Sequence, residues 1–117
     1  MNKISEYISD KYGILADYPW AKYHEFGVFR RKKSKKWFGL FMQIDAGHTD
    51  FRQNYSGEIR LLNLKCDPSL AYILVDNDKI SRAYHMNKRL WISLNLNSKI
   101  TNSQIFDLID ESFEASK

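Results

Sequence analysis

The stretch Leu61–Pro68 constrains the fold more than any other part of this sequence. It reads Leu-Leu-Asn-Leu-Lys-Cys-Asp-Pro, with leucines in a strand-like alternation. Successive side chains of a strand point to opposite faces, and one face here carries Leu62, Leu64 and Cys66, the other Leu61, Asn63 and Lys65. Asp67 is suited to accept hydrogen bonds from the first free amides of a helix, and Pro68 to the first helical position, which needs no N–H donor. The stretch therefore predicts a buried strand that runs directly into a capped helix.

The spacing of apolar residues predicts the other elements. Helices are expected at residues 3–15 and 68–75, and a last helix begins at the capping box formed by Thr101 and Gln104. Strands are expected at residues 23–29, 36–44, 58–66, 80–85 and 90–96. Short links between successive strands imply antiparallel pairing. The expected fold class is α+β, a single small domain over residues 1–117 with an antiparallel β-sheet built from two hairpins and a middle strand, and with N-terminal, central and C-terminal helices.

The same periods assign side chains to the core. The first helix is expected to bury a stripe formed by Ile4, Ile8, Tyr12 and Leu15. The strand at 36–44 alternates so that one face carries Phe38, Leu40, Met42 and Ile44. Leu90 is expected to begin the buried face of the last strand, and Asn87, which tolerates a positive φ, lies in the turn expected before it. The polar segment 45–57 is expected to be a mobile loop.

Positive charge is concentrated in one place. The formal net charge is +4, from 18 Lys and Arg against 14 Asp and Glu. Six of the 18 fall within seven positions, namely Arg30, Arg31, Lys32, Lys33, Lys35 and Lys36. Cations at a hairpin tip can neutralise phosphates without reading bases, and Trp37 at its base can stack on a base. The alternative is a solvated loop that discourages aggregation.

A second cationic patch is expected on the later hairpin. Between Lys79 and Lys99 there are five basic residues and no acidic one. The candidate residues of this patch are Lys65, Arg82, His85, Lys88, Arg89 and Trp91. Two cationic hairpins in one small domain favour a nucleic-acid partner more strongly than one does.

Other classes of protein receive little support. The single cysteine, Cys66, excludes an intrachain disulfide and is predicted to be a buried structural thiol. The three histidines show no metal-ligand spacing, and the five glycines form no phosphate-binding loop. No apolar stretch has the length of a signal-peptide core or of a membrane span. We therefore expect a cytoplasmic protein with no catalytic residues, no metal and no cofactor.

Two motifs resemble the MmcQ/YjbR family. They are the stretch Leu62–Pro68 and the stretch Ala83–Ile92, and supporting matches occur at Tyr18-Pro19-Trp20, at Lys36–Leu40 and in the helix around Ile105–Phe113. The resemblance covers nearly the whole chain. It implies a fold similar to the double-wing DNA-binding arrangement, in which β-ribbons project as wings. Lys65, His85, Asn87, Lys88 and Trp91 match the family's motif positions, whereas residues 30–36 are longer and more basic than the family's usual segment.

The leading hypothesis is a non-enzymatic protein that binds nucleic acid, expected to be duplex DNA, through its cationic β-hairpins. The candidate nucleic-acid-binding residues are Arg30, Arg31, Lys32, Lys33, Lys35, Lys36, Trp37, Lys65, Arg82, His85, Asn87, Lys88, Arg89 and Trp91. One alternative is an adaptor that binds an acidic protein. Another is a small-ligand binder or enzyme with a cleft near Lys65, His85 and Trp91. No membrane partner is expected, and an unpaired sheet edge allows a monomer or a weak homodimer.

Overall fold

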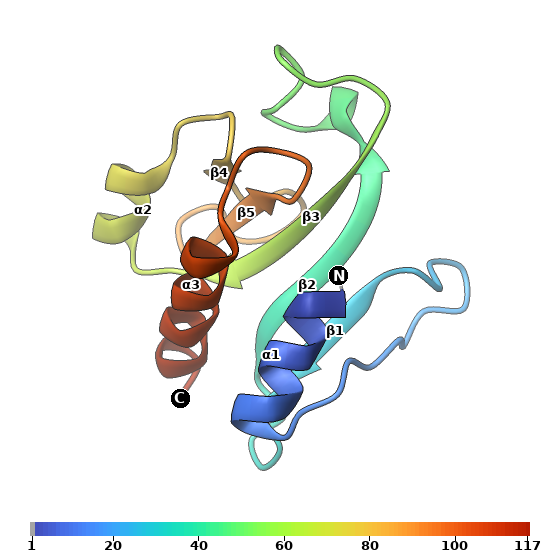
Figure 1. The fold of residues 1–117 in the computed structure, drawn as a ribbon, viewed down its shortest axis with the longest axis vertical. Helices are drawn as coiled ribbons and strands as arrows, with labels where there is room; N and C mark the ends of the chain where they lie inside the picture. Colours follow the sequence, from blue (N-terminus) through green and yellow to red (C-terminus); the bar gives the residue numbers. More distant parts are fainter. Residues whose placement is uncertain (1) are drawn as a thin grey trace.

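The predicted order of helices and strands is confirmed (Figure 1). The computed structural model describes residues 2–117, so Met1, the first residue of the predicted domain, lies outside the described residues. The elements are α1 (Asn2–Tyr12), β1 (Gly27–Arg30), β2 (Trp37–Asp45), a 3-10 helix η1 (Ala46–His48), β3 (Glu58–Lys65), α2 (Pro68–Leu74), β4 (Ile80–Arg82), β5 (Trp91–Asn95) and α3 (Asn102–Ala115). The domain is α+β, as expected.

The five strands form one antiparallel sheet in the order β1-β2-β3-β5-β4. The helices pack on one face, where α1 and α3 lie side by side. Leu62, Leu64 and Cys66 belong to the core on this face, and Leu61 belongs to a second core on the other face. The two faces predicted for the stretch Leu61–Pro68 are therefore confirmed.

The predicted helix starts are also confirmed. The Asp67 carboxylate accepts a hydrogen bond from the Ser69 amide at 2.8 Å, with Pro68 in the first turn of α2. Thr101 Oγ1 accepts one from the Gln104 amide at 3.1 Å and caps α3. Each cap satisfies an amide that has no partner within the helix.

The first helix is shorter than predicted, and its last core residue is different. Gly13 has a φ of +65° and ends α1, with its amide donating to the Ser9 carbonyl. The chain turns at this glycine, so Ile14 is buried and Leu15 is 79% exposed. The assignment of Leu15 to the core was wrong because the helical period does not continue beyond Gly13.

The alternation predicted for β2 is broken by a bulge. Phe29 pairs with Gly39, but Arg30 pairs with Trp37, so Phe38 has no partner of its own. Phe38 turns toward the helices, whereas Leu40 and Met42 face the second core. The predicted shared face of Phe38 and Leu40 was therefore wrong.

Loops rather than α-helices cover the second face of the sheet. The predicted strand at 23–29 is a strand only from Gly27 onward, and residues 23–26 form a turn closed by the Phe26 amide on the Tyr23 carbonyl. The segment predicted to be a mobile loop, 45–57, contains η1 and buries Phe51 completely against this face. Residues 83–90 form a third loop, because β4 ends at Arg82 rather than at residue 85.

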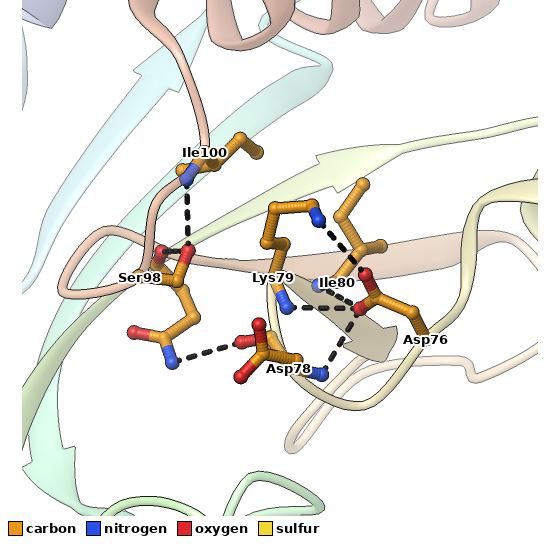
Figure 2. A network of polar contacts seen from close by, with 7 residues as sticks. Asp76, Asp78, Lys79, Ile80, Ser98 and Ile100 are labelled. Carbon is orange, nitrogen blue, oxygen red and sulfur yellow. Dashed lines mark hydrogen bonds and ion pairs between the residues drawn. The ribbon is translucent and has the colours of Figure 1, made fainter.

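A polar turn fixes the start of β4 (Figure 2). The Asp76 carboxylate accepts three backbone hydrogen bonds, from the amides of Asp78, Lys79 and Ile80, at 3.0, 2.8 and 3.0 Å. Burial raises the pKa of this carboxyl group, but the three amides and Lys79 outweigh that effect and leave the pKa below its ordinary value. The turn therefore holds the edge strand β4 in register with β5 while the carboxylate stays ionised.

Candidate nucleic-acid interface

The two predicted cationic turns lie at the same end of the sheet. The turn of residues 31–36 joins the end of β1 to the start of β2, where Arg30 pairs with Trp37. The loop of residues 83–90 joins the end of β4 to the start of β5, where Trp91 pairs with Lys65, the last residue of β3. Antiparallel pairing places the end of one strand beside the start of the next. The fold therefore unites two patches that are about 50 residues apart in sequence.

Cations and indole rings alternate across this end of the sheet. Arg30 and Trp37 are cross-strand partners, and so are Lys65 and Trp91. Lys65 follows Leu64, which pairs with Gly39, so it lies beside the start of β2. Lys65 points to the same face as Asn63, which is the face away from the helices. The four half-buried side chains therefore form one row on that face. We call Arg30, Trp37, Lys65 and Trp91 the cross-strand row.

Arg30 is held over the indole ring of Trp37. The guanidinium carbon lies 5.6 Å from the ring centroid, within the range of a cation–π interaction. One guanidinium nitrogen also lies 3.1 Å from the Asp17 carboxylate. Part of its charge is thus already balanced, and its position beside the ring is constrained.

Two other cations of the first turn hold that turn to the end of α3. Arg31 donates to Ser116 Oγ at 3.0 Å and to the Phe113 carbonyl, and its guanidinium carbon lies 3.8 Å from the Phe113 ring centroid. Lys36 Nζ donates to the Lys117 carbonyl at 3.2 Å. Both satisfy carbonyls near the end of α3 and place positive charge at the negative end of its dipole. These residues stabilise the fold before any ligand is considered.

The remaining three lysines of the turn are exposed. The side chains of Lys32, Lys33 and Lys35 form no hydrogen bond or ion pair with another side chain in residues 2–117. The turn is closed by the Arg31 amide on the Lys36 carbonyl at 2.9 Å, and Lys35 takes a φ of +64° within it. The backbone thus presents three free ammonium groups on a short, hydrogen-bonded turn.

The second turn uses some of its predicted site residues to hold its own shape. Lys88 Nζ donates to the Ala83 carbonyl at 2.8 Å, and Asn87 Oδ1 accepts from the Arg89 amide at 3.0 Å. The residue of this loop with a positive φ is His85, at +59°, and not Asn87. Leu90 precedes β5 and is 37% exposed, so its assignment to the core was also wrong. Arg89 and His85 remain exposed, and Arg82 is half-buried.

Between the loops lies an aromatic groove of about 380 Å³, on the face that carries the cross-strand row. Trp20 stands nearly perpendicular to Trp37, at 79° and 5.8 Å between ring centroids, and to Phe26, at 83° and 6.4 Å. Leu40 and Met42 also line it. The residues that complete the lining are Tyr23, His85, Met86 and Asn87.

Sequence reasoning found only part of this groove. It singled out Trp37, His85 and Asn87, but placed Trp20 in a loop without a role and Phe26 in a strand. The signal that was available is the density of aromatic residues in a segment with little secondary structure: Tyr18, Trp20, Tyr23 and Phe26 lie within nine positions. Aromatic residues in a loop need a surface to pack on, and here that surface is the second face of the sheet.

In the described part of the chain, no cleft joins the three residues that the enzyme hypothesis requires, Lys65, His85 and Trp91. The groove contains His85 but is not lined by Lys65 or Trp91. Cys66 is buried, and burial raises the pKa of its thiol, which makes it a poor nucleophile. Within residues 2–117, no three His, Cys, Asp or Glu side chains gather to hold a metal ion. None of the helices in this part of the chain combines the length and the hydrophobicity that a membrane span requires.

Comparisons with known proteins give one family model and several similar proteins. The YjbR family model matches residues 9–115. A Bacillus subtilis (strain 168) protein named Uncharacterized protein YyaQ is 37% identical over 114 residues, or 97% of this chain and 95% of that one. A crystal structure of a Pseudomonas syringae protein has a TM-score of 0.91 at 33% identity, covering 99% of this chain and 97% of the other. Deinococcus radiodurans DR2400, a DUF419 protein, shares the fold with a TM-score of 0.70 at 19% identity over 96% of this chain and 74% of its own.

Proposed function

The chain belongs to the YjbR family, and we propose that this member is a non-enzymatic protein that binds nucleic acid through its two cationic turns. The resemblance to a double-wing DNA-binding arrangement supports the proposal by analogy of fold. The positions of the charged groups support it independently of that analogy. Flexible, exposed cations on a small basic surface are best suited to bind phosphate groups.

The observation that carries the proposal is that both turns lie at one end of the sheet, with the cross-strand row running from one to the other. A strand of nucleic acid that crosses this end of the sheet meets exposed lysines of the first turn, then the cross-strand row, then Arg89 of the second turn. The rings of the row offer stacking surfaces between the cations.

The structure narrows the candidates for phosphate contact. Arg31 and Lys36 are engaged with the end of α3, and Lys88 with the Ala83 carbonyl. The exposed cations left for a ligand are Lys32, Lys33, Lys35 and Arg89. If all four neutralise a phosphate, the logarithm of the binding constant should fall against the logarithm of salt concentration with a slope of about −3 to −4.

A binding assay with a labelled duplex at about 50 mM salt tests the proposal. We expect saturable binding by the native protein and at least a tenfold loss in the variant Lys32→Gln/Lys33→Gln/Lys35→Gln. The matched control is Lys3→Gln/Arg52→Gln/Lys99→Gln, which removes the same charge from exposed positions at the opposite end of the sheet. Equal losses of affinity in the two variants would show that binding depends on net charge alone and would overturn the assigned surface. Absence of binding to duplex and single strands alike would overturn the proposal itself.

A further inference from the structure

We propose that the aromatic groove holds one unpaired nucleobase, so that the protein prefers single-stranded nucleic acid, or duplex with an extruded base, to a fully paired duplex. This inference rests on the proposed function and adds to it the form of nucleic acid that is bound. The groove joins Trp37 of the cross-strand row to Trp20 and Phe26 in the preceding loop. It is therefore continuous with the cationic end of the sheet.

The groove is an open concave surface lined by the faces and edges of aromatic rings. The ring of Trp20 stands nearly perpendicular to the rings of Trp37 and Phe26, so a planar guest meets the face of one ring and the edges of others. Such arrangements match the electrostatics of aromatic pairs. Leu40 and Met42 line the groove too, and Met86 faces these rings from the 83–90 loop. A volume of about 380 Å³ lies within the range of small-molecule sites.

The charges around the groove select the kind of guest. None of the residues that line it is acidic, so a cationic guest would have no counter-ion there. Two cations lie at its rim instead. Arg30 lies over Trp37, with part of its charge balanced by Asp17, and Lys22 Nζ lies 5.6 Å from the centroid of Tyr23. A neutral ring that carries an anionic phosphate suits this site, because the ring fits the lining without acidic groups and the phosphate can pair with the cations at the rim.

Polar groups at one side of the groove suit a base edge. His85 is exposed, with its ring 3.9 Å from that of Tyr84. The Asn87 side-chain oxygen accepts from the Arg89 amide, which leaves its NH₂ group as a donor. A base in a paired duplex has its faces covered by neighbours and must leave the stack before it can enter such a site. Unpaired bases do not have to meet that cost.

The test compares three labelled oligonucleotides of equal length: single-stranded oligothymidine, a paired duplex, and an abasic strand that keeps the phosphates but has no bases. We expect the thymidine strand to bind more tightly than the abasic strand by about 5- to 150-fold, the range that corresponds to one base–aromatic stacking contact. We expect quenching of tryptophan fluorescence by the thymidine strand only. The variant Trp20→Leu, which keeps apolar bulk, should lose this preference, whereas Tyr72→Leu, at an exposed aromatic residue on α2, should keep it.

The outcomes separate this inference from the proposed function. Equal, salt-dependent binding of the thymidine and abasic strands would overturn base capture and leave the phosphate contacts standing. A preference for thymidine that survives Trp20→Leu would place base contacts elsewhere and also overturn the groove as the site. If Trp20→Leu unfolds, Met86→Ala in the facing loop supplies the same comparison. No binding of any strand would overturn the proposed function and this inference together.

Discussion

Asn63 and Ser93 are cross-strand partners that are both fully buried, and they hold the 83–90 loop against the sheet. Ser93 Oγ donates to Asn63 Oδ1 at 2.5 Å, and Asn63 Nδ2 donates to the Tyr84 carbonyl at 3.0 Å. The Tyr84 amide in turn donates to Ser93 Oγ at 3.1 Å. This closed set of hydrogen bonds places His85 and Met86 on one side of the aromatic groove.

Removing Asn63 should therefore loosen the loop as well as lower stability. Asn63→Ala removes the acceptor of the buried Ser93 O–H group and the donor to the Tyr84 carbonyl, at a cost of about 1–3 kcal/mol. We expect the substitution to speed amide hydrogen exchange more in residues 83–90 than in β2 or α3. Asn54→Ala, at an exposed asparagine, is the control and should leave both quantities unchanged. A uniform increase in exchange over the whole chain would contradict the local role.

Arg31 and Lys33 should behave differently although they are two residues apart. Arg31→Met removes the hydrogen bonds to Ser116 and Phe113 and should lower the free energy of unfolding by about 1.5–3 kcal/mol. Lys33→Met removes an exposed charge and should leave stability within about 0.5 kcal/mol. Urea unfolding measures the first effect, and the salt dependence of oligonucleotide binding, altered only in Lys33→Met, measures the second. A reversal of this pattern would exchange the roles assigned to the two residues.

Asp110 should make the contact between α1 and α3 sensitive to acid. Its carboxylate accepts from Tyr7 and Tyr12, each at 2.7 Å, and from Lys11 at 2.8 Å. Burial raises the pKa of this carboxyl group, but the three donors outweigh that effect and hold it below its ordinary value of 3.8. A lowered pKa in the folded state stabilises the protein above the unfolded-state value, and this contribution is lost as pH falls through the folded-state value.

Asp110→Asn should accordingly cost about 1–2 kcal/mol near pH 7, and the difference from the native protein should shrink below about pH 4. Denaturant midpoints across this pH range provide the measurement. Asp107→Asn, at an exposed position of the same helix, is the control and should show a small, nearly constant difference. A difference for Asp110→Asn that stays constant down to about pH 2 would rule out the ionised carboxylate as its source.

Much of the fold was predictable because its signals are local. The alternation in Leu61–Pro68, the Asp67 cap and the Thr101 cap each depend on residues within a few positions of one another. The bulge at Phe38 was not predictable in this way, because both faces of the strand near it are apolar and the sequence shows no break in the two-residue alternation. The end of α1 at Gly13 had a local signal, and the position of that glycine predicts the end of the helix better than the apolar stripe does.

The candidate site was predictable only in its charges. Lysines and arginines in a run are visible in the sequence, but their partners are not: Arg31 contacts residues 82 and 85 positions away. The aromatic groove depends on the 17–26 loop and the 83–90 loop meeting over β2, which no local pattern encodes. Contacts between distant loops are set by the completed sheet, so the structure was needed to reveal them.

The salt dependence of binding tests the central claim most directly. Three exposed lysines of the first turn are expected to contact three phosphates, each contributing about 0.9 to the slope on duplex DNA. The variant Lys32→Gln/Lys33→Gln/Lys35→Gln should therefore have a slope less negative than that of the native protein by about 2 to 3, while the variant Lys3→Gln/Arg52→Gln/Lys99→Gln should keep the native slope. Native and triple-lysine proteins with the same slope, or binding that does not change with salt, would contradict the account.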